Sequence, residues 1–145
     1  MSKENVETLR RVWKDASLSD SPIKVDALDP NSVAVILKSL APEVEFHEDA
    51  RFPEADIYRG VESIREYWEG FTGTFDQFVF EVEDLVDLGG DRVLVLLTLT
   101  IRGRGSGAAA EERPGWIFTV RDGLTVRIDA VFDRNDALEA AGLSE

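Results

Sequence analysis

The sequence predicts an α+β fold in which helices pack against a curved mixed or antiparallel sheet. Before Gly73 the apolar residues recur at helical spacing, and after Gly73 they alternate or run continuously, as in strands. Two turn signals, Gly89-Gly90-Asp91 and Arg121-Asp122-Gly123, join later strands as hairpins. Helices followed by strands are typical of a sheet with helices on one face. A length of 145 residues without a linker predicts one domain over residues 1–145.

Three helices are expected before the sheet. The first begins near Ser2. The second begins at Asp29-Pro30, where a capping side chain precedes a proline at the first helical position, and it ends at Ala41-Pro42. Gly60 opens the third, and residues 17–28 and 48–59 form a loop and an irregular segment. The buried stripes are Val6, Leu9, Val12, Trp13 and Ala16, then Val33, Ile36, Leu37 and Leu40, then Val61, Ile64, Trp68 and Phe71.

Strands are expected between the helices and throughout the second half. Val44 and Phe46 alternate with polar residues in a short first strand. Later strands cover residues 78–82, 92–101, 116–120 and 125–132, and residues 102–107 form a hairpin tip. Residues 92–101 are almost continuously apolar, which predicts a strand covered on both faces. Asp133 or Asn135 caps a short C-terminal helix that buries Ala137, Leu138 and Ala141 and ends at Gly142.

The composition excludes several classes of function. The chain has no cysteine, so disulfides, a thiolate nucleophile and cysteine-ligated metals are excluded. No stretch approaches the roughly twenty apolar residues of a membrane span, and the N-terminal residues lack the apolar run of a signal peptide. A cytoplasmic location is therefore expected. A net charge of -13 repels phosphates and anionic lipids, so neither nucleic acid nor membrane is an expected partner.

Three motifs carry a family resemblance across nearly the whole chain. They are APEVEFHED at 41–49, YRGVESIREYW at 58–68 and RDGLTVRIDAVFDRNDAL at 121–138. In this order they resemble the SnoaL-like branch of the NTF2-like superfamily, although the 17–28 connection is longer than usual. The resemblance implies a sheet wrapped into a half-open cone around the N-terminal helices, a pocket inside and a homodimer through the outer sheet face. Strand 92–101 is apolar on both faces and favours a dimer independently, because a monomer should not expose one of these faces to solvent.

The resemblance also implies candidate chemistry, which differs between members of the superfamily. The base of the isomerases falls near Glu48, whereas their oxyanion acid and tyrosine fall near Trp116 and Trp13, which do not reproduce that pair. The catalytic arginine and aspartates of the epoxide hydrolases have no counterparts in this sequence. The last-strand aspartate of SnoaL-type cyclases matches Asp129. Because side chains alternate along a strand, Asp129 faces away from a pocket lined by Ile128 unless a bulge intervenes. The alternative is that Asp129 pairs with Arg127 at or near the dimer face.

His47 is the strongest candidate for acid–base chemistry, since histidine titrates most readily near neutral pH. Glu48 or Asp49 would orient it. Adjacent residues of a strand point to opposite faces, so this run makes a poor metal site, and neither metal nor cofactor is expected. Arg51 and Arg59 flank the acidic loop, where either could hold a ligand carboxylate, but ion pairing on the surface is the favoured expectation.

Two functions remain open. The first is a homodimer that binds a small, mostly apolar molecule. If it is also an enzyme, the expected reaction is cofactor-independent proton transfer of the cyclase, isomerase or dehydratase type. The second is a non-catalytic binding or dimerisation module whose cavity is filled by its own side chains. The residues expected to line a pocket are aromatic or apolar, and in a cone the same side chains can be both core and ligand contacts. They are Trp13, Tyr58, Trp68, Phe71, Trp116, Phe118, Ile128 and Phe132.

Overall fold

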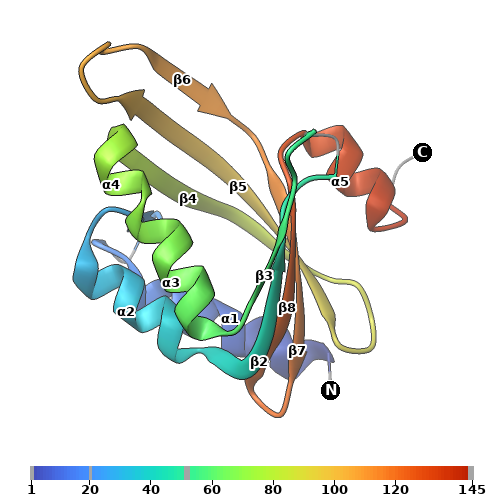
Figure 1. Cartoon of the computed structure of the whole chain (residues 1–145). Helices are drawn as coiled ribbons and strands as arrows, with labels where there is room; N and C mark the ends of the chain where they lie inside the picture. Colours follow the sequence, from blue (N-terminus) through green and yellow to red (C-terminus); the bar gives the residue numbers. More distant parts are fainter. Residues whose placement is uncertain (1, 20, 51–52, 144–145) are drawn as a thin grey trace.

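Helices lie on both sides of one curved sheet, and the fold is α+β as predicted (Figure 1). The computed structural model describes residues 2–19, 21–50 and 53–143. Helices α1 (Ser2–Ala16), α2 (Pro30–Lys38) and α3 (Val61–Glu69) cover one side, with the short α4 (Phe71–Thr74) after α3. The C-terminal helix α5 (Arg134–Ala140) lies on the other side.

Eight strands form a single mixed sheet in the order β1-β4-β5-β7-β8-β2-β3, with β6 paired to β5 off this path. All ladders are antiparallel except that of β2 and β8, which is parallel. The strands are β1 (Lys24–Asp26), β2 (Leu40–His47), β3 (Ile57–Arg59), β4 (Phe75–Asp87), β5 (Arg92–Gly103), β6 (Ala109–Glu112), β7 (Gly115–Arg121) and β8 (Leu124–Val131).

Three short strands were not predicted, two because they depend on pairing outside their own segment and one because it is exposed. The segment 17–28 contains β1, whose Val25 pairs with Phe80. The segment 48–59 contains β3, which pairs with β2. Strand β6 is exposed throughout and so lacks an apolar period. Helix α2 ends at Lys38, before Ala41-Pro42, because Leu40 already pairs with β8.

The two sheet faces have different cores. On the inner face, Val95, Trp116 and Ala130 lie in register and pack with α1, α2 and α3. On the outer face, Leu94 and Ile117 are covered by Ala137 of α5. The chain's own helix therefore covers part of the second face of β5, which weakens the argument that its apolar outer side requires a second copy.

The helix caps follow the sequence closely. The Asp29 side chain accepts a hydrogen bond from the Asn31 N–H at the start of α2. Asp133, rather than Asn135, caps α5 by accepting from the Asp136 N–H. Gly142 has φ +76, as a left-handed C-terminal cap requires. Within the described part of the chain, no helix combines the length and hydrophobicity of a membrane span.

Candidate functional site

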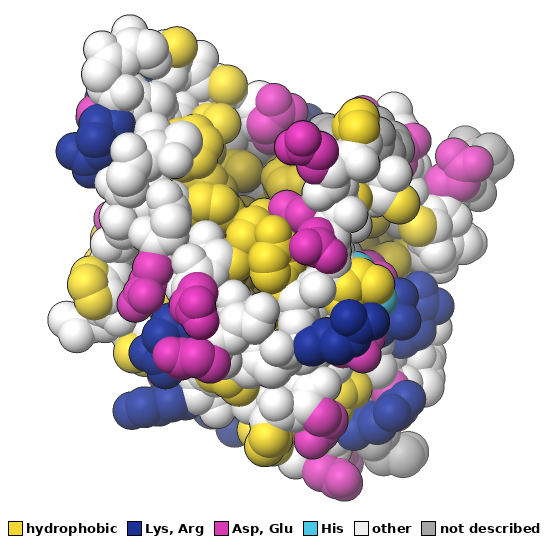
Figure 2. All heavy atoms as spheres, in the orientation of Figure 1, with side chains coloured by type: hydrophobic (Ala, Val, Ile, Leu, Met, Phe, Trp, Pro, Cys, Tyr) yellow, Lys and Arg dark blue, Asp and Glu magenta, His cyan; other side chains and the backbone are white. Residues whose placement is uncertain are grey.

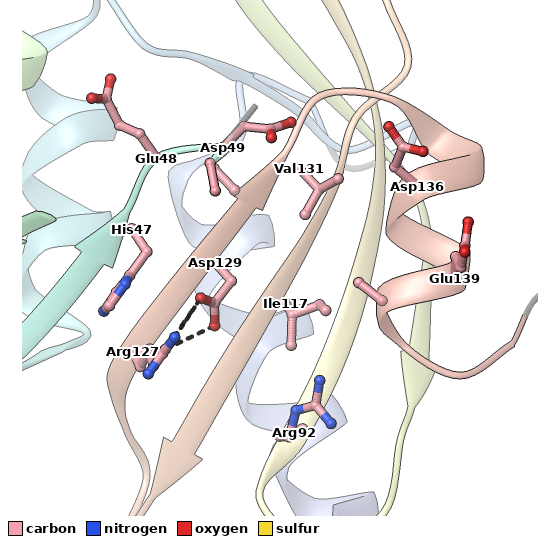
Figure 3. Close-up of a pocket in the computed structure, with 13 residues that line it drawn as sticks. His47, Glu48, Asp49, Arg92, Ile117, Arg127, Asp129, Val131, Asp136 and Glu139 are labelled. Atoms are coloured by element: carbon pink, nitrogen blue, oxygen red, sulfur yellow. Dashed lines mark hydrogen bonds and ion pairs between the residues drawn. The ribbon is translucent and has the colours of Figure 1, made fainter. Parts of the chain in front are cut away.

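The four residues expected to carry acid–base chemistry line one open groove on the outer face of the sheet (Figure 3). The groove has a volume of about 760 Å³ and includes His47, Glu48, Asp49 and Asp129. His47 of β2 and Asp129 of β8 face each other in the parallel ladder, and Glu48 and Asp49 follow directly after β2. The sheet thus gathers these residues at the outer groove, although the carboxylate of Glu48 turns back to the helix side.

His47 is half-buried and held by a carboxylate two residues earlier on the same face of β2. Its Nε2–H donates to Glu45 Oε1 at 2.9 Å. Arg59 Nε lies 3.5 Å from the other oxygen of Glu45. The hydrogen bond from His47, followed by the charge of Arg59, lowers the pKa of Glu45. Arg59 is thus placed beside a protein carboxylate, while Arg51 lies outside the described residues.

Asp129 faces outward, as strand parity predicts, because Ile128 and Ala130 are buried on the inner face. Both of its oxygens accept hydrogen bonds from Arg127, at 2.9 Å from Nε and from Nη2 (Figure 3). This hydrogen bonding raises the pKa of Arg127. The bidentate pair fixes Asp129 on the open outer face.

Glu48 turns to the helix side of the sheet. One of its oxygens accepts from the Tyr67 hydroxyl at 2.7 Å, and the other accepts from the Asp56 N–H at 3.0 Å. Burial, and then the hydrogen bond to Glu48, raises the pKa of Tyr67, so this phenol remains a donor. Sequence reasoning missed Tyr67, which gives the helix side a polar carboxylate–phenol pair.

Asp49 joins the ends of two strands. Its side chain is buried, and Oδ2 accepts from the Phe132 N–H at 3.0 Å. This contact connects the end of β2 to the residue after β8, 83 positions later in the chain. Asp49 therefore has a structural role independent of any chemistry in the groove.

The helix side of the cone is closed. A cavity of only about 20 Å³ remains at its centre, which is space for one water molecule. Of the predicted pocket residues, the structure brings three tryptophans to this cavity. The lining is Trp13, Trp68 and Trp116 together with Val25, Ala27, Val33, Ile36 and Phe80.

The other predicted pocket residues lie around this cavity in different settings. Phe118 and Ile128 are buried core residues. Tyr58 stacks on Tyr67 with ring centroids 4.3 Å apart, and burial followed by the charge of Glu48 raises its pKa. Phe71 stacks on Phe78 at 4.8 Å. Phe132 is partly buried beside Asp49.

A cleft between α2 and α3 adjoins the cavity and was not predicted. It has a volume of about 370 Å³ and shares Ala27, Val33 and Trp68 with the cavity. Its remaining lining is Leu28, Pro30, Ala34, Leu37, Arg65, Glu69 and Thr72. The helical stripes contain Val33, Leu37 and Trp68, but only the packing of the helices shows that they leave space. Away from this cleft, Figure 2 shows hydrophobic side chains gathered near the centre of the visible face, with acidic side chains beside them.

Among residues 2–19, 21–50 and 53–143, no three histidine, cysteine or carboxylate side chains converge as metal ligands would.

The curved sheet, the helices inside it and the central cavity define an NTF2-like cone. The family model for the SnoaL-like domain matches residues 25–128, and the chain belongs to this family. A comparison with curated proteins found no match.

Solved structures share the fold at low identity. An NTF2-like protein from Burkholderia thailandensis E264 has a TM-score of 0.70 and 23% identity over 96% of this chain and 95% of the other. A protein from Jannaschia sp. CCS1, provisionally named a SnoaL-like polyketide cyclase, has a TM-score of 0.70 and 19% identity. The match covers 99% of this chain and 94% of the other. TerC, co-crystallised with polyporic acid, has a TM-score of 0.67 and 19% identity. The match covers 95% of this chain and 98% of the other. At these identities the likeness shows the fold alone.

Proposed function

We propose that this SnoaL-like protein binds a small, mostly apolar molecule on the helix side of the cone. The observation that carries the proposal is the cleft of about 370 Å³ whose floor is shared with the tryptophan-lined cavity. Small-molecule sites are concave, mostly apolar and roughly 300–1,000 Å³ in volume. Co-crystallisation of TerC with polyporic acid supports this use of the fold.

The lining of the cavity favours binding without proton transfer. A general acid or base must lie within hydrogen-bond reach of the bound molecule, directly or through one water. All eight cavity residues are apolar or aromatic. The cleft adds one carboxylate, Glu69, which is exposed at the end of α3. The centroid of the Phe46 ring lies 5.6 Å from that of Tyr67 and 5.5 Å from that of Trp116. Phe46 therefore packs between the Glu48–Tyr67 pair and the cavity wall.

The first prediction tests this site by filling the cleft. Ala34 is exposed on α2 and lines the cleft, so Ala34→Phe places a ring in the space. Binding of α-tetralone, a bicyclic apolar ketone, is expected to weaken by about tenfold or more, which corresponds to about 1.4 kcal/mol. Isothermal titration or the intrinsic fluorescence of the three tryptophans measures the affinity.

Asn31→Phe is the matched control, since Asn31 is exposed on the same helix but does not line the cleft. This variant is expected to bind like the wild-type protein. Equal binding by the wild type, Ala34→Phe and Asn31→Phe would show that the ligand does not bind in this cleft. A wild-type protein that binds no α-tetralone would contradict the proposal and favour a module whose cavity is filled by its own side chains.

The outer groove supports a second candidate, cofactor-independent proton transfer. The specific observation is that His47, Glu48, Asp49 and Asp129 line the same space of about 760 Å³. His47 would act as the acid–base group, with Glu45 orienting its imidazole through the 2.9 Å hydrogen bond. A groove that does this chemistry must remain accessible in solution.

The homodimer expected from the family resemblance competes for the same surface. A second outer groove of about 740 Å³ shares Arg92, Arg127 and Asp129 with the first and adds Glu43 and Glu45. In a two-fold interface the same patch meets itself, so arginines of one copy can face glutamates of the other. We propose that a second copy covers this face.

The second prediction separates these two uses of the groove. Sedimentation of the wild-type protein is expected to show a dimer, and Arg127→Glu is expected to weaken it by placing like charges opposite each other. Glu62→Gln, an exposed change on α3, is the control and should leave the dimer intact. A wild-type protein that stays monomeric at every concentration would contradict the dimer and leave the groove open for acid–base chemistry.

A further inference from the structure

Trp116, which lines the central cavity, carries a buried hydrogen-bond donor without an acceptor. Among the described residues, two buried side-chain polar atoms have no partner, Trp116 Nε1 and Arg134 Nε. Arg134 is otherwise well held, because its Nη2 donates to Leu97 O at 2.8 Å and contacts Glu83 at 2.6 Å. The indole N–H is the only polar group of Trp116, whose side chain is 4% exposed. Such an unpaired donor is costly in a folded interior.

The cavity that Trp116 lines supplies no good acceptor. The other side chains that line the cavity are hydrocarbon or tryptophan and carry no acceptor oxygen. A single water fits in about 20 Å³, but a buried water needs two to four polar partners, which this lining does not provide. The ring centroids of Phe46 and Phe80 lie 5.5 and 5.1 Å from that of Trp116. The face of an aromatic ring is a weaker hydrogen-bond acceptor than an oxygen atom.

We infer that Trp116 selects an apolar ligand that carries an acceptor oxygen, such as a ketone or an ether, at the end that reaches the cavity. The inference rests on the proposed binding function and adds the chemical class of the ligand. Val33 and Trp68 border both the cleft and the cavity, and the proposal requires the Trp68 side chain to turn so that the two spaces join. A ligand in the cleft then reaches Trp116 with its oxygen, and its hydrocarbon part stays between α2 and α3.

A matched pair of probes tests this selection. α-Tetralone and tetralin have similar bicyclic shapes, and only the ketone carries an acceptor. The ratio of their affinities, ketone over hydrocarbon, is measured by titration on the wild-type protein and on Trp116→Phe. The ratio is expected to fall by about two- to tenfold in the variant, the usual net contribution of a neutral hydrogen bond. Using the ratio removes the effect of the extra space that Trp116→Phe leaves, since both probes experience it.

A second variant keeps the test valid if Trp116→Phe does not fold. Incorporation of benzothienylalanine at position 116 replaces the indole N–H by sulfur and preserves the ring shape. The same fall in the ratio is expected. If both probes bind but the ratio is unchanged, the inference is wrong and the binding function stands. If neither probe binds the wild-type protein, the proposed function fails, and this inference fails with it.

Discussion

Replacement of Gly115 by alanine is expected to lift α5 from the outer face of the sheet. A Cβ at this position would lie 2.5 Å from Ala137 Cβ and 3.3 Å from Leu94 Cδ1, and the first distance is too short for any real contact. Either the helix or the strand must move, and overpacking of this kind costs about 1–3 kcal/mol. Chemical denaturation measures the loss of stability, and amide hydrogen exchange shows whether protection is lost first in α5.

Two variants control this prediction. Gly73→Ala introduces the same methyl group where no atom lies within 4 Å, so its stability should remain close to that of the wild type. Ala137→Gly removes the opposing methyl at a cost of about 1 kcal/mol in helix propensity. In the double variant Gly115→Ala/Ala137→Gly, the two losses should be less than additive. Full additivity would show that this contact does not position α5.

Asp49→Ala is expected to destabilise the fold by about 1–3 kcal/mol, because the Phe132 N–H loses its buried acceptor. The Asp49 side chain is only 6% exposed, and its 3.0 Å hydrogen bond holds the chain where β8 leads into α5. Exchange protection of residues 132–140 should fall together with global stability. Thermal or urea unfolding, together with hydrogen exchange, measures both effects.

Asp49→Asn distinguishes this structural role from the catalytic role predicted for the residue. The amide keeps an acceptor oxygen for the Phe132 N–H, so most of the stability should remain. Asp133→Ala removes the cap of α5 without touching β2 and should cost about 1 kcal/mol. If Asp49→Ala unfolds like the wild-type protein, the hydrogen bond to Phe132 is not what stabilises this junction.

Local sequence rules predicted the elements that depend on near neighbours. The capping residues Asp29 and Asp133 define helix starts because each bonds to a backbone N–H two or three residues later. Period-two alternation placed Ile128 inside and Asp129 outside. The partner of His47 was also within reach of this rule, since Glu45 lies two residues earlier on the same strand face.

Features that depend on distant partners could not be predicted in this way. Strands β1 and β3 are three residues long and are ordered by pairing with β4 and β2. The hydrogen bond from Tyr67 to Glu48 spans 19 residues. The sequence indicated an aromatic interior, but whether those rings fill the cone depends on helix packing. That packing closes the centre and leaves its space between α2 and α3.

The three indole N–H signals of ¹⁵N-labelled protein provide the most direct test of ligand binding inside the cone. Trp13, Trp68 and Trp116 all line the cavity, so each signal reports on it. On titration with α-tetralone, the Trp116 signal is expected to shift saturably in the wild-type protein and in Asn31→Phe. In Ala34→Phe the same shift should need about tenfold more ketone, or more. If all three signals stay unchanged in folded wild-type protein up to the solubility limit of the ketone, the cavity is filled by its own side chains and the binding proposal is wrong.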